Sequence, residues 1–225
     1  MNEQEILRRL KERTDPEALA GMARYGIQTA KAFGVGIPFL RQMAAEIGTD
    51  HALAGRLWRA GYRETRLLAT LLDDPELISE SQMDRWVAGC DSWDVCDGLC
   101  NNLLRKVEGA YAKAFDWALR EEEFVKRAGF VLIAALAVHD KRQEDAPFEA
   151  FLEIIRRQAD DDRNYVKKAV NWALRQIGKR NSRLHRKAIQ TARLIGREDS
   201  KAARWIATDA LRELTSENTR HRLRR

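Results

Sequence analysis

The chain has 225 residues, 44% of them hydrophobic and 33% charged, so we expect a folded protein of one or two domains and not a disordered one. Its net charge of +6 is unevenly spread, because residues 1–162 hold 22 Lys/Arg and 29 Asp/Glu whereas residues 163–225 hold 18 Lys/Arg and 5 Asp/Glu. The basic end points to a polyanionic partner, either nucleic acid or a membrane surface, although a solvated basic face without a partner gives the same pattern.

The residue pattern predicts helices throughout the chain. Ala, Leu, Arg and Glu dominate, alternating runs of β-branched residues are absent, and each of the four prolines lies near a plausible helix start. We therefore predict an all-α protein with short connections. The expected helices lie at roughly 3–12, 16–31, 37–47, 50–60, 63–73, 79–88, 92–106, 109–119, 122–138, 147–158, 163–180, 183–195 and 199–215.

The N-terminal part of the chain holds few distinctive residues. Its first 17 residues are charged throughout and lack the apolar stretch of a signal peptide. Tyr25 is expected to end an early helix, where ordinary packing explains it. Gly34-Val35-Gly36 lacks the third glycine of a dinucleotide fingerprint, and no phosphate-binding loop motif occurs, so nucleotide cofactors have no support.

The segment 91–97, Asp-Ser-Trp-Asp-Val-Cys-Asp, is more informative. Asp91 or Ser92 is a plausible N-cap for the following helix. Asp97 comes one helical turn after Trp93, so both side chains are expected on the same side of that helix. A carboxylate that borders an apolar and aromatic stripe requires a shifted pKa or a specific partner, and a simple salt bridge is the alternative.

The cysteines and histidines give no sign of a metal or of disulfides. Cys90, Cys96 and Cys100 lie close together and are odd in number, which fits reduced thiols that fill the core of a cytoplasmic protein. No two of the four histidines have the spacing of metal ligands, and no CxxC pair exists. We expect neither a metal nor an organic cofactor.

The helix expected at 122–138 combines an apolar run with a cation at its margin. The run covers residues 128–138, well short of the roughly 20 residues that cross a bilayer, so no membrane partner is expected. Arg127 precedes it. Its guanidinium could clamp a phosphate or pair with a carboxylate such as Asp97.

The helix expected at 163–180 has two contrasting faces. Its aliphatic residues form one stripe, and Trp172 lies roughly opposite the centre of that stripe, with Lys168, Arg175 and Lys179 on the same side. A tryptophan among cations is what a surface for a polyanion with stackable bases would use. Packing of Trp172 on a neighbouring repeat is the alternative.

A weak internal repeat organises the second half. The segments KRAGFVLIAALAV, KKAVNWALRQIGK and ARWIATDALRELT align on Arg127, Lys168 and Arg204, which are 41 and 36 residues apart. Repeats of this length are typical of HEAT-like α-solenoids, and a generic helical bundle is the alternative. We predict one domain, 1–225, made of HEAT-like two-helix repeats with a concave basic face, its last ~10 residues forming a frayed basic tail.

Four of these features together resemble a known family, the AlkD-like DNA alkylation repair glycosylases, which are HEAT-like solenoids. The matching features are a Met-Ala-Arg-Tyr context at Tyr25, the Trp93-Asp94-Val95-Cys96-Asp97 segment, the helical Arg127, and Trp172-Ala173-Leu174-Arg175. The resemblance runs from about residue 16 to residue 215.

The resemblance implies an enzyme that hydrolyses the N-glycosidic bond of cationic N3- or N7-alkylated purines, chiefly 3-methyladenine and 7-methylguanine, as the first step of base excision repair. It implies that Asp97 stabilises the positive charge developing on the sugar and positions the water. Trp93 and Trp172 would flank the lesion, Tyr25 would close the aromatic cleft, and Arg127 would hold the backbone phosphate.

The partner implied is double-stranded DNA that contains alkylated bases, bound by a monomer in the nucleoid without base flipping into a deep pocket. Lys168, Arg175 and Lys179 would add DNA contacts. The alternative function is a non-catalytic HEAT-repeat protein that binds duplex or branched DNA. A protein-interaction scaffold is a third possibility, which the basic end supports poorly.

Overall fold

The computed structural model describes residues 1–223, and within them it has α-helices, two short 3-10 helices and no strand. The chain divides into two compact units, a first unit at Met1–Glu108 and a second unit at Gly109–Arg225. No helix in the described part is both long enough and apolar enough to span a bilayer.

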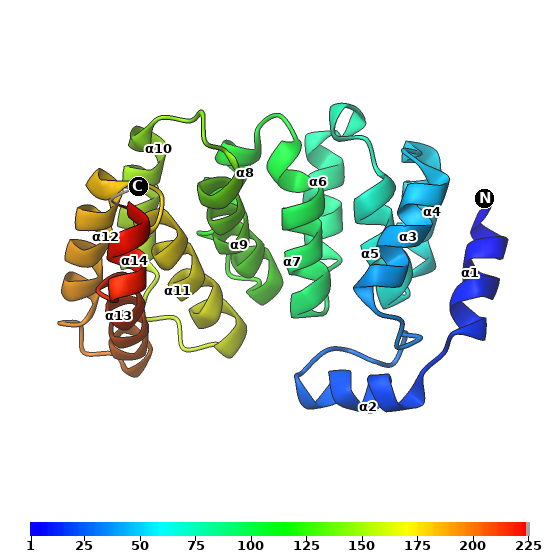
Figure 1. The fold of residues 1–225 in the computed structure, drawn as a ribbon, viewed down its shortest axis with the longest axis horizontal. Helices are drawn as coiled ribbons and strands as arrows, with labels where there is room; N and C mark the ends of the chain where they lie inside the picture. Colours follow the sequence, from blue (N-terminus) through cyan, green and yellow to red (C-terminus); the bar gives the residue numbers. More distant parts are fainter. Residues whose placement is uncertain (224–225) are drawn as a thin grey trace. The chain divides into compact units, whose positions relative to one another are not determined.

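The first unit stacks its helices in two layers (Figure 1). Helix α5 packs against α3 on one side and α7 on the other, which makes one layer. Helix α4, which packs on α5 and α1, belongs to the other layer together with α6. Trp58 of α4 stacks on Trp86 of α6, with ring centres 4.3 Å apart. The elements are α1 (Glu3–Glu12), α2 (Pro16–Arg24), α3 (Ile37–Ile47), α4 (His51–Ala60), α5 (Arg63–Leu72), the 3-10 helix η1 (Pro75–Leu77), α6 (Glu80–Ala88), α7 (Trp93–Asn102) and the 3-10 helix η2 (Leu104–Lys106).

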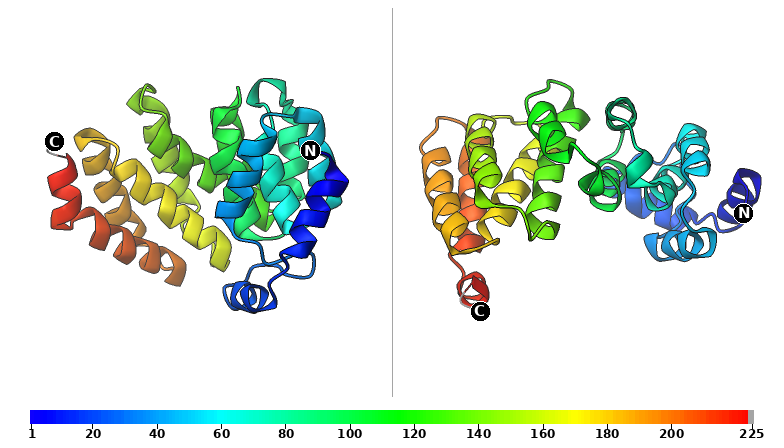
Figure 2. Two further views of the ribbon diagram at one scale, coloured as in Figure 1. Left: turned by 45° about the vertical axis from the view of Figure 1, so that its right-hand side comes forward. Right: turned by 90° about the horizontal axis from the view of Figure 1, so that it is seen from above.

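The second unit repeats the same pattern of packing (Figure 2). Helices α9, α11 and α13 pack side by side in one layer, and α8, α10 and α12 in the other. The chain therefore alternates between layers, as stacked two-helix repeats do. The helices are α8 (Ala110–Trp117), α9 (Glu123–His139), α10 (Asp145–Arg157), α11 (Asn164–Gly178), α12 (Ser182–Ile195), α13 (Lys201–Leu214) and α14 (Glu217–Leu223).

Short polar side chains cap six of the α-helices that the structure describes. An oxygen of the N-cap side chain accepts a backbone N–H of the first turn, which satisfies donors that have no partner within the helix. Side chains that cap α-helices in this way are Asn2, Asp15, Asp50, Ser79, Asn181 and Ser200. The ranges predicted from the sequence agree with most of the observed helices to within two residues at each end.

The structure differs from the expected helices at three places. Helix α2 ends at Arg24 with Tyr25 as its C-cap, as expected for Tyr25, and does not continue to residue 31, because Gly26 turns the chain with a left-handed φ of 72°. Helix α7 ends at Asn102, and Leu103 separates it from η2. Helix α14 occupies most of the segment predicted as a frayed tail, whose residues 224–225 lie outside the described part.

The backbone of α9 lies close to the end of α8 at Gly129. A Cβ there would lie 2.3 Å from the backbone nitrogen of Ala118, closer than any real contact. We expect Gly129→Ala to lower the free energy of unfolding by about 2 kcal/mol, because the two backbones must separate. Gly21→Ala is the matched control, since its Cβ meets nothing nearer than 4.0 Å and alanine favours the helix. Urea unfolding of both variants checks this, and equal stability of the two would contradict it.

Candidate functional site

The structure brings Tyr25 and Trp93 together, although 68 residues separate them. The indole Nε1 of Trp93, the first residue of α7, donates a hydrogen bond to the Tyr25 carbonyl oxygen at 3.0 Å. Tyr25 follows the last residue of α2, and 78% of its surface is exposed. Gln28 N donates to the Oγ of Ser92, the residue that caps α7, at 3.4 Å. These two bonds fix the chain after α2 against the start of α7.

Asp97 lies one turn further along α7 and is partly exposed. Its own carbonyl oxygen accepts a bond from Asn101 Nδ2 at 2.9 Å. Val95 and Leu99 are buried and anchor the opposite face of α7. The helix therefore presents Trp93 and Asp97 along one partly exposed side, which confirms the expected spacing of the two residues on α7.

A buried ionic network supports this region, and the sequence did not point to it. Glu64 of α5, with no exposed surface, accepts backbone bonds from Phe33 at 3.0 Å, Gly34 at 3.0 Å and Val35 at 3.2 Å. Arg63, which is 8% exposed, donates to Glu64 Oε1 at 3.2 Å. One glutamate thus holds the loop between α2 and α3 in place, and an adjacent arginine balances its charge.

The same arginine ties that loop to α7. Arg63 Nε donates to Asp94 Oδ2 at 2.6 Å, and its Nη1 donates to the Val35 carbonyl at 3.3 Å. Ser92 Oγ donates to the other Asp94 oxygen at 2.6 Å. Asp94 thus connects α7 to α5, so the position of Trp93 depends on this network.

The three cysteines fill the core of the first unit, as predicted. Cys90, Cys96 and Cys100 are free thiols, and all three are buried. Contact with Cys96 and burial raise the pKa of the Cys90 thiol, and burial raises that of Cys100. Within the described residues no three His, Cys, Asp or Glu side chains are grouped as metal ligands would be.

Arg127 and Trp172, predicted site residues, both lie in the second unit. Arg127 of α9 is only 6% exposed, and its Nη1 donates to the Tyr165 carbonyl of α11 at 2.6 Å. Trp172 of α11 is partly exposed, and its Nε1 lies 2.8 Å from the side-chain oxygen of Gln176 when that amide is oriented to accept. Arg127 thus links two helices of one layer, and its contact with a phosphate stays a prediction.

Two of the three cations predicted around Trp172 have acidic partners on α13. Arg175 Nη1 and Lys179 Nζ each lie 2.5 Å from an oxygen of Glu213, and Asn171 Nδ2 donates to Asp209 at 2.6 Å. Residues four apart on α11 therefore face residues four apart on α13. Burial raises the pKa of Glu213, but the bonds from Lys179 and Arg175 outweigh it and hold that pKa below its ordinary value.

These ion pairs distinguish the two cations that stabilise the fold, Arg175 and Lys179, from the accessible cation, Lys168. Lys168 is exposed, whereas Arg175 and Lys179 are partly buried against Glu213. We expect Lys168→Ala to weaken duplex binding and to lower its salt slope by about 0.9. Arg175→Ala should instead lower the free energy of unfolding by about 1 kcal/mol at neutral pH. That stabilisation is lost as the pH falls through the lowered pKa of Glu213.

Fluorescence anisotropy at several salt concentrations, together with urea unfolding of both variants at pH 7, checks this expectation. The opposite result, in which Arg175→Ala changes the salt slope and Lys168→Ala does not, would restore Arg175 as the main phosphate contact.

The sequence did not single out Trp205, which is 40% exposed on α13. The ammonium of Lys167 on α11 lies 5.3 Å from the centre of its ring. The repeat alignment pairs Trp172 with residue 208 and not with Trp205, so the repeat gave no signal for it. An aromatic side chain beside a lysine on the α11–α13 layer is a further candidate for contact with nucleic acid.

Comparison with known proteins decides the family. The family model for the DNA alkylation repair enzymes matches residues 6–214, nearly the whole chain. The chain belongs to this family. The resemblance inferred from Tyr25, Trp93, Asp97 and the later motifs is therefore confirmed.

Solved structures confirm the fold of this DNA alkylation repair family member. One structure, of a new family of proteins related to the HEAT-like repeat DNA glycosylases with affinity for branched DNA structures, is similar with a TM-score of 0.82. The two chains are 22% identical, and the match covers 99% of this chain and 96% of the other. The predicted all-α solenoid of HEAT-like repeats is thus correct, and its concave basic face stays a prediction.

Two further comparisons add nothing to this assignment. A designed armadillo repeat protein in complex with a (KR)4 peptide matches with a TM-score of 0.40 and 16% identity, over 82% of this chain and 78% of the other. No curated protein matches this DNA alkylation repair family member.

Proposed function

We propose that this chain is a DNA glycosylase that hydrolyses the N-glycosidic bond of cationic N3- or N7-alkylated purines in double-stranded DNA. The observation that carries the proposal is the arrangement of Tyr25, Trp93 and Asp97 on the first unit. A hydrogen bond of 3.0 Å joins the two aromatic residues, and the carboxylate follows one turn along the same helix. An aromatic surface with an adjacent carboxylate is suited to a cationic lesion.

In this reaction the leaving base needs little catalytic help, whereas the sugar needs stabilisation of its developing positive charge. An alkylated purine already carries a positive charge, so when its bond to C1′ breaks it leaves as a neutral base with both electrons of that bond. The sugar becomes an oxocarbenium ion, whose charge a nearby carboxylate stabilises. Asp97 takes that role, and it accepts a proton from the water that attacks C1′.

The remaining predicted residues hold the DNA. On the second unit, Trp172 contacts the DNA, Arg127 contacts the backbone phosphate, and Lys168 adds a phosphate contact. The chain acts as a monomer on duplex DNA. Support comes from the family match, which covers both units, and from the excess of basic residues at 163–225.

Release of bases from methylated DNA tests the proposal. Duplex DNA treated with a methylating agent is incubated with the protein, and free 3-methyladenine and 7-methylguanine are measured by chromatography. We expect release of both in proportion to the enzyme. Abasic sites should appear in equal number, because each hydrolysis leaves one. DNA binding without any base release would reject the glycosylase function.

A second function is non-catalytic binding of duplex or branched DNA. The similar solved structure favours it, because that protein belongs to a family with affinity for branched DNA structures. Binding of a four-way junction and of a linear duplex of equal length would be compared. A strong preference for the junction, together with no base release, would support this function in place of the first.

A further inference from the structure

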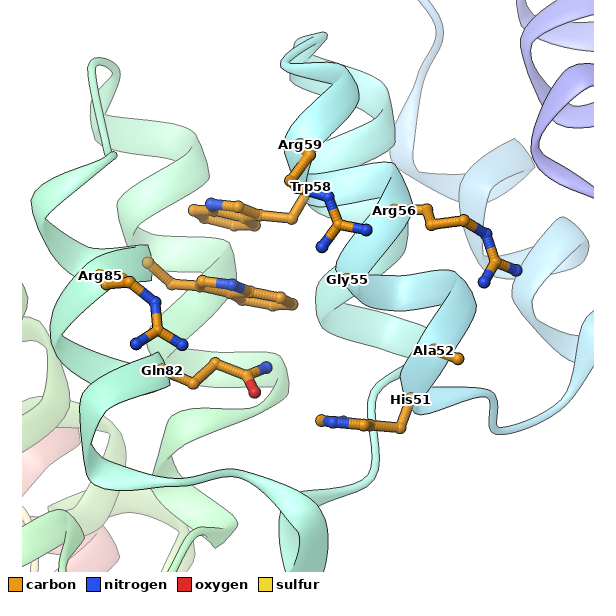
Figure 3. Close-up of a pocket in the computed structure, with 9 residues that line it drawn as sticks. His51, Ala52, Gly55, Arg56, Trp58, Arg59, Gln82 and Arg85 are labelled. Carbon is orange, nitrogen blue, oxygen red and sulfur yellow. The ribbon is translucent and has the colours of Figure 1, made fainter.

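A polar pocket lies between α4 and α6, in the layer of the first unit that does not carry Trp93 and Asp97 (Figure 3). Its volume is about 580 Å³. Arg59 and Arg85 both line it, and Figure 3 shows their guanidinium groups over α4 and α6, on the two sides of the pocket, with His51 and Gln82 below them. None of these residues was expected to have a function from the sequence.

The floor of the pocket is held rigidly. Asp73, which is 5% exposed, accepts a bond from His51 Nδ1 at 2.6 Å and one from Gln82 Nε2 at 2.8 Å. Trp58 and Trp86 stack almost in parallel, at an angle of 3°, and are 8% and 6% exposed. The two helices are thus fixed to each other on both sides of the pocket, and its polar side chains are oriented before any ligand binds.

The cations of the pocket are available to a ligand. Arg59 and Arg85 are exposed and make no ion pair with any residue that the structure describes. Arg56 points away from the pocket in Figure 3, and its Nε lies 3.9 Å from Glu3. The first unit holds 14 Lys/Arg and 17 Asp/Glu, so these arginines are not part of a generally basic surface. Two guanidinium groups without an ion pair that line one pocket in an acidic unit indicate an anion site.

We propose that this pocket binds the phosphodiester backbone of a DNA strand, as a second contact separate from the surface that bears Trp93 and Asp97. Guanidinium groups match phosphate oxygens in geometry and charge. The indole faces of Trp58 and Trp86 are turned to each other, so the pocket offers bases no stacking surface, and binding is independent of sequence. A family member that binds DNA on one layer would thus have a site on its other layer for a second strand or DNA segment.

Nuclear magnetic resonance tests the site directly, because the indole N–H signals of Trp58 and Trp86 report on the pocket itself. Each is assigned by a single Trp→Phe variant. The labelled protein is titrated with an octathymidine strand, with thymidine, with inorganic phosphate and with an octaglutamate peptide. We expect saturable shifts of both signals with the strand and none with thymidine. Phosphate and the peptide should bind at least 10-fold more weakly than the strand.

Variants then assign the binding to the two arginines. Arg59→Ala/Arg85→Ala should weaken binding of the strand about 10-fold or more and lower the salt slope by about 1.4, or about 0.7 for each lost contact. Lys11→Ala/Arg41→Ala, which removes two exposed cations of the same unit outside the pocket, should leave both quantities unchanged. Only exposed side chains change in either variant, and thermal unfolding confirms that each is folded.

Four results would overturn the proposal. They are the absence of a shift with the strand, equal affinity of the two double variants, affinity for octaglutamate equal to that for the strand, and affinity for inorganic phosphate equal to that for the strand. The third result would identify an acidic protein segment as the ligand, and the fourth a small phosphate compound. None of them depends on base release, so the proposal stands or fails separately from the glycosylase function.

Discussion

Asp97→Asn is expected to lower base release from methylated duplex DNA by roughly 100-fold or more, with duplex affinity unchanged within about 2-fold. The asparagine has the same shape as the aspartate but no negative charge, so it stabilises the oxocarbenium ion poorly and accepts no proton from water. Binding is unaffected because phosphate contacts, which supply most of the affinity, lie elsewhere. Single-turnover base release and fluorescence anisotropy measure the two effects.

Asp91→Asn is the matched control for that experiment. Asp91 lies six residues earlier, is exposed, and pairs with Arg66 at 3.0 Å on the surface. Loss of a surface pair costs little, so base release should stay within about 2-fold of the wild type. If Asp97→Asn releases 7-methylguanine as fast as the wild type, the assignment of the carboxylate is wrong.

Glu64→Gln should lower the free energy of unfolding by about 3 kcal/mol. One oxygen of Glu64 accepts from Phe33 N, and the other accepts from Gly34 N, Val35 N and Arg63. A glutamine in the same place turns its amide NH₂ toward a donor, whichever way it is oriented, and it leaves the buried guanidinium of Arg63 with less negative charge. Urea unfolding at pH 7 measures the loss.

The control for this variant is Glu46→Gln, which removes a carboxylate from a surface pair with Arg9 and should cost less than about 1 kcal/mol. A second readout concerns the site. Because the Glu64 network holds the loop after Tyr25, base release by folded Glu64→Gln should also fall. Equal stability of the two variants would show that the buried network does not stabilise the first unit.

Local patterns in the sequence account for most of the fold. The residue pattern and the prolines near helix starts predicted nearly every helix, including α9, whose buried length follows from its long apolar run. The predicted end of α2 was wrong because the residues after Tyr25 are compatible with a helix. What stops that helix is Gly26 and the bonds of the following loop to Ser92 and Glu64, which are distant in sequence.

The site was predictable only where one helix carries it. Trp93 and Asp97 lie four residues apart, so their common side follows from helical spacing alone. The bond from Trp93 to Tyr25 crosses 68 residues and has no local signal. The pairing of Arg175 and Lys179 with Glu213 was missed for the same reason, because the faces of α11 and α13 were judged separately.

The buried cysteines have a consequence for the reactivity of the first unit toward alkylating agents. Such electrophiles react with thiolates far faster than with protonated thiols. Cys90, Cys96 and Cys100 are all buried, and the raised pKa values of Cys90 and Cys100 keep both protonated at neutral pH. Every cysteine of the chain is thus buried in the core of the first unit, and Cys96 and Cys100 belong to α7, the helix that carries Asp97. The first unit therefore exposes no thiol to the electrophiles that alkylate DNA.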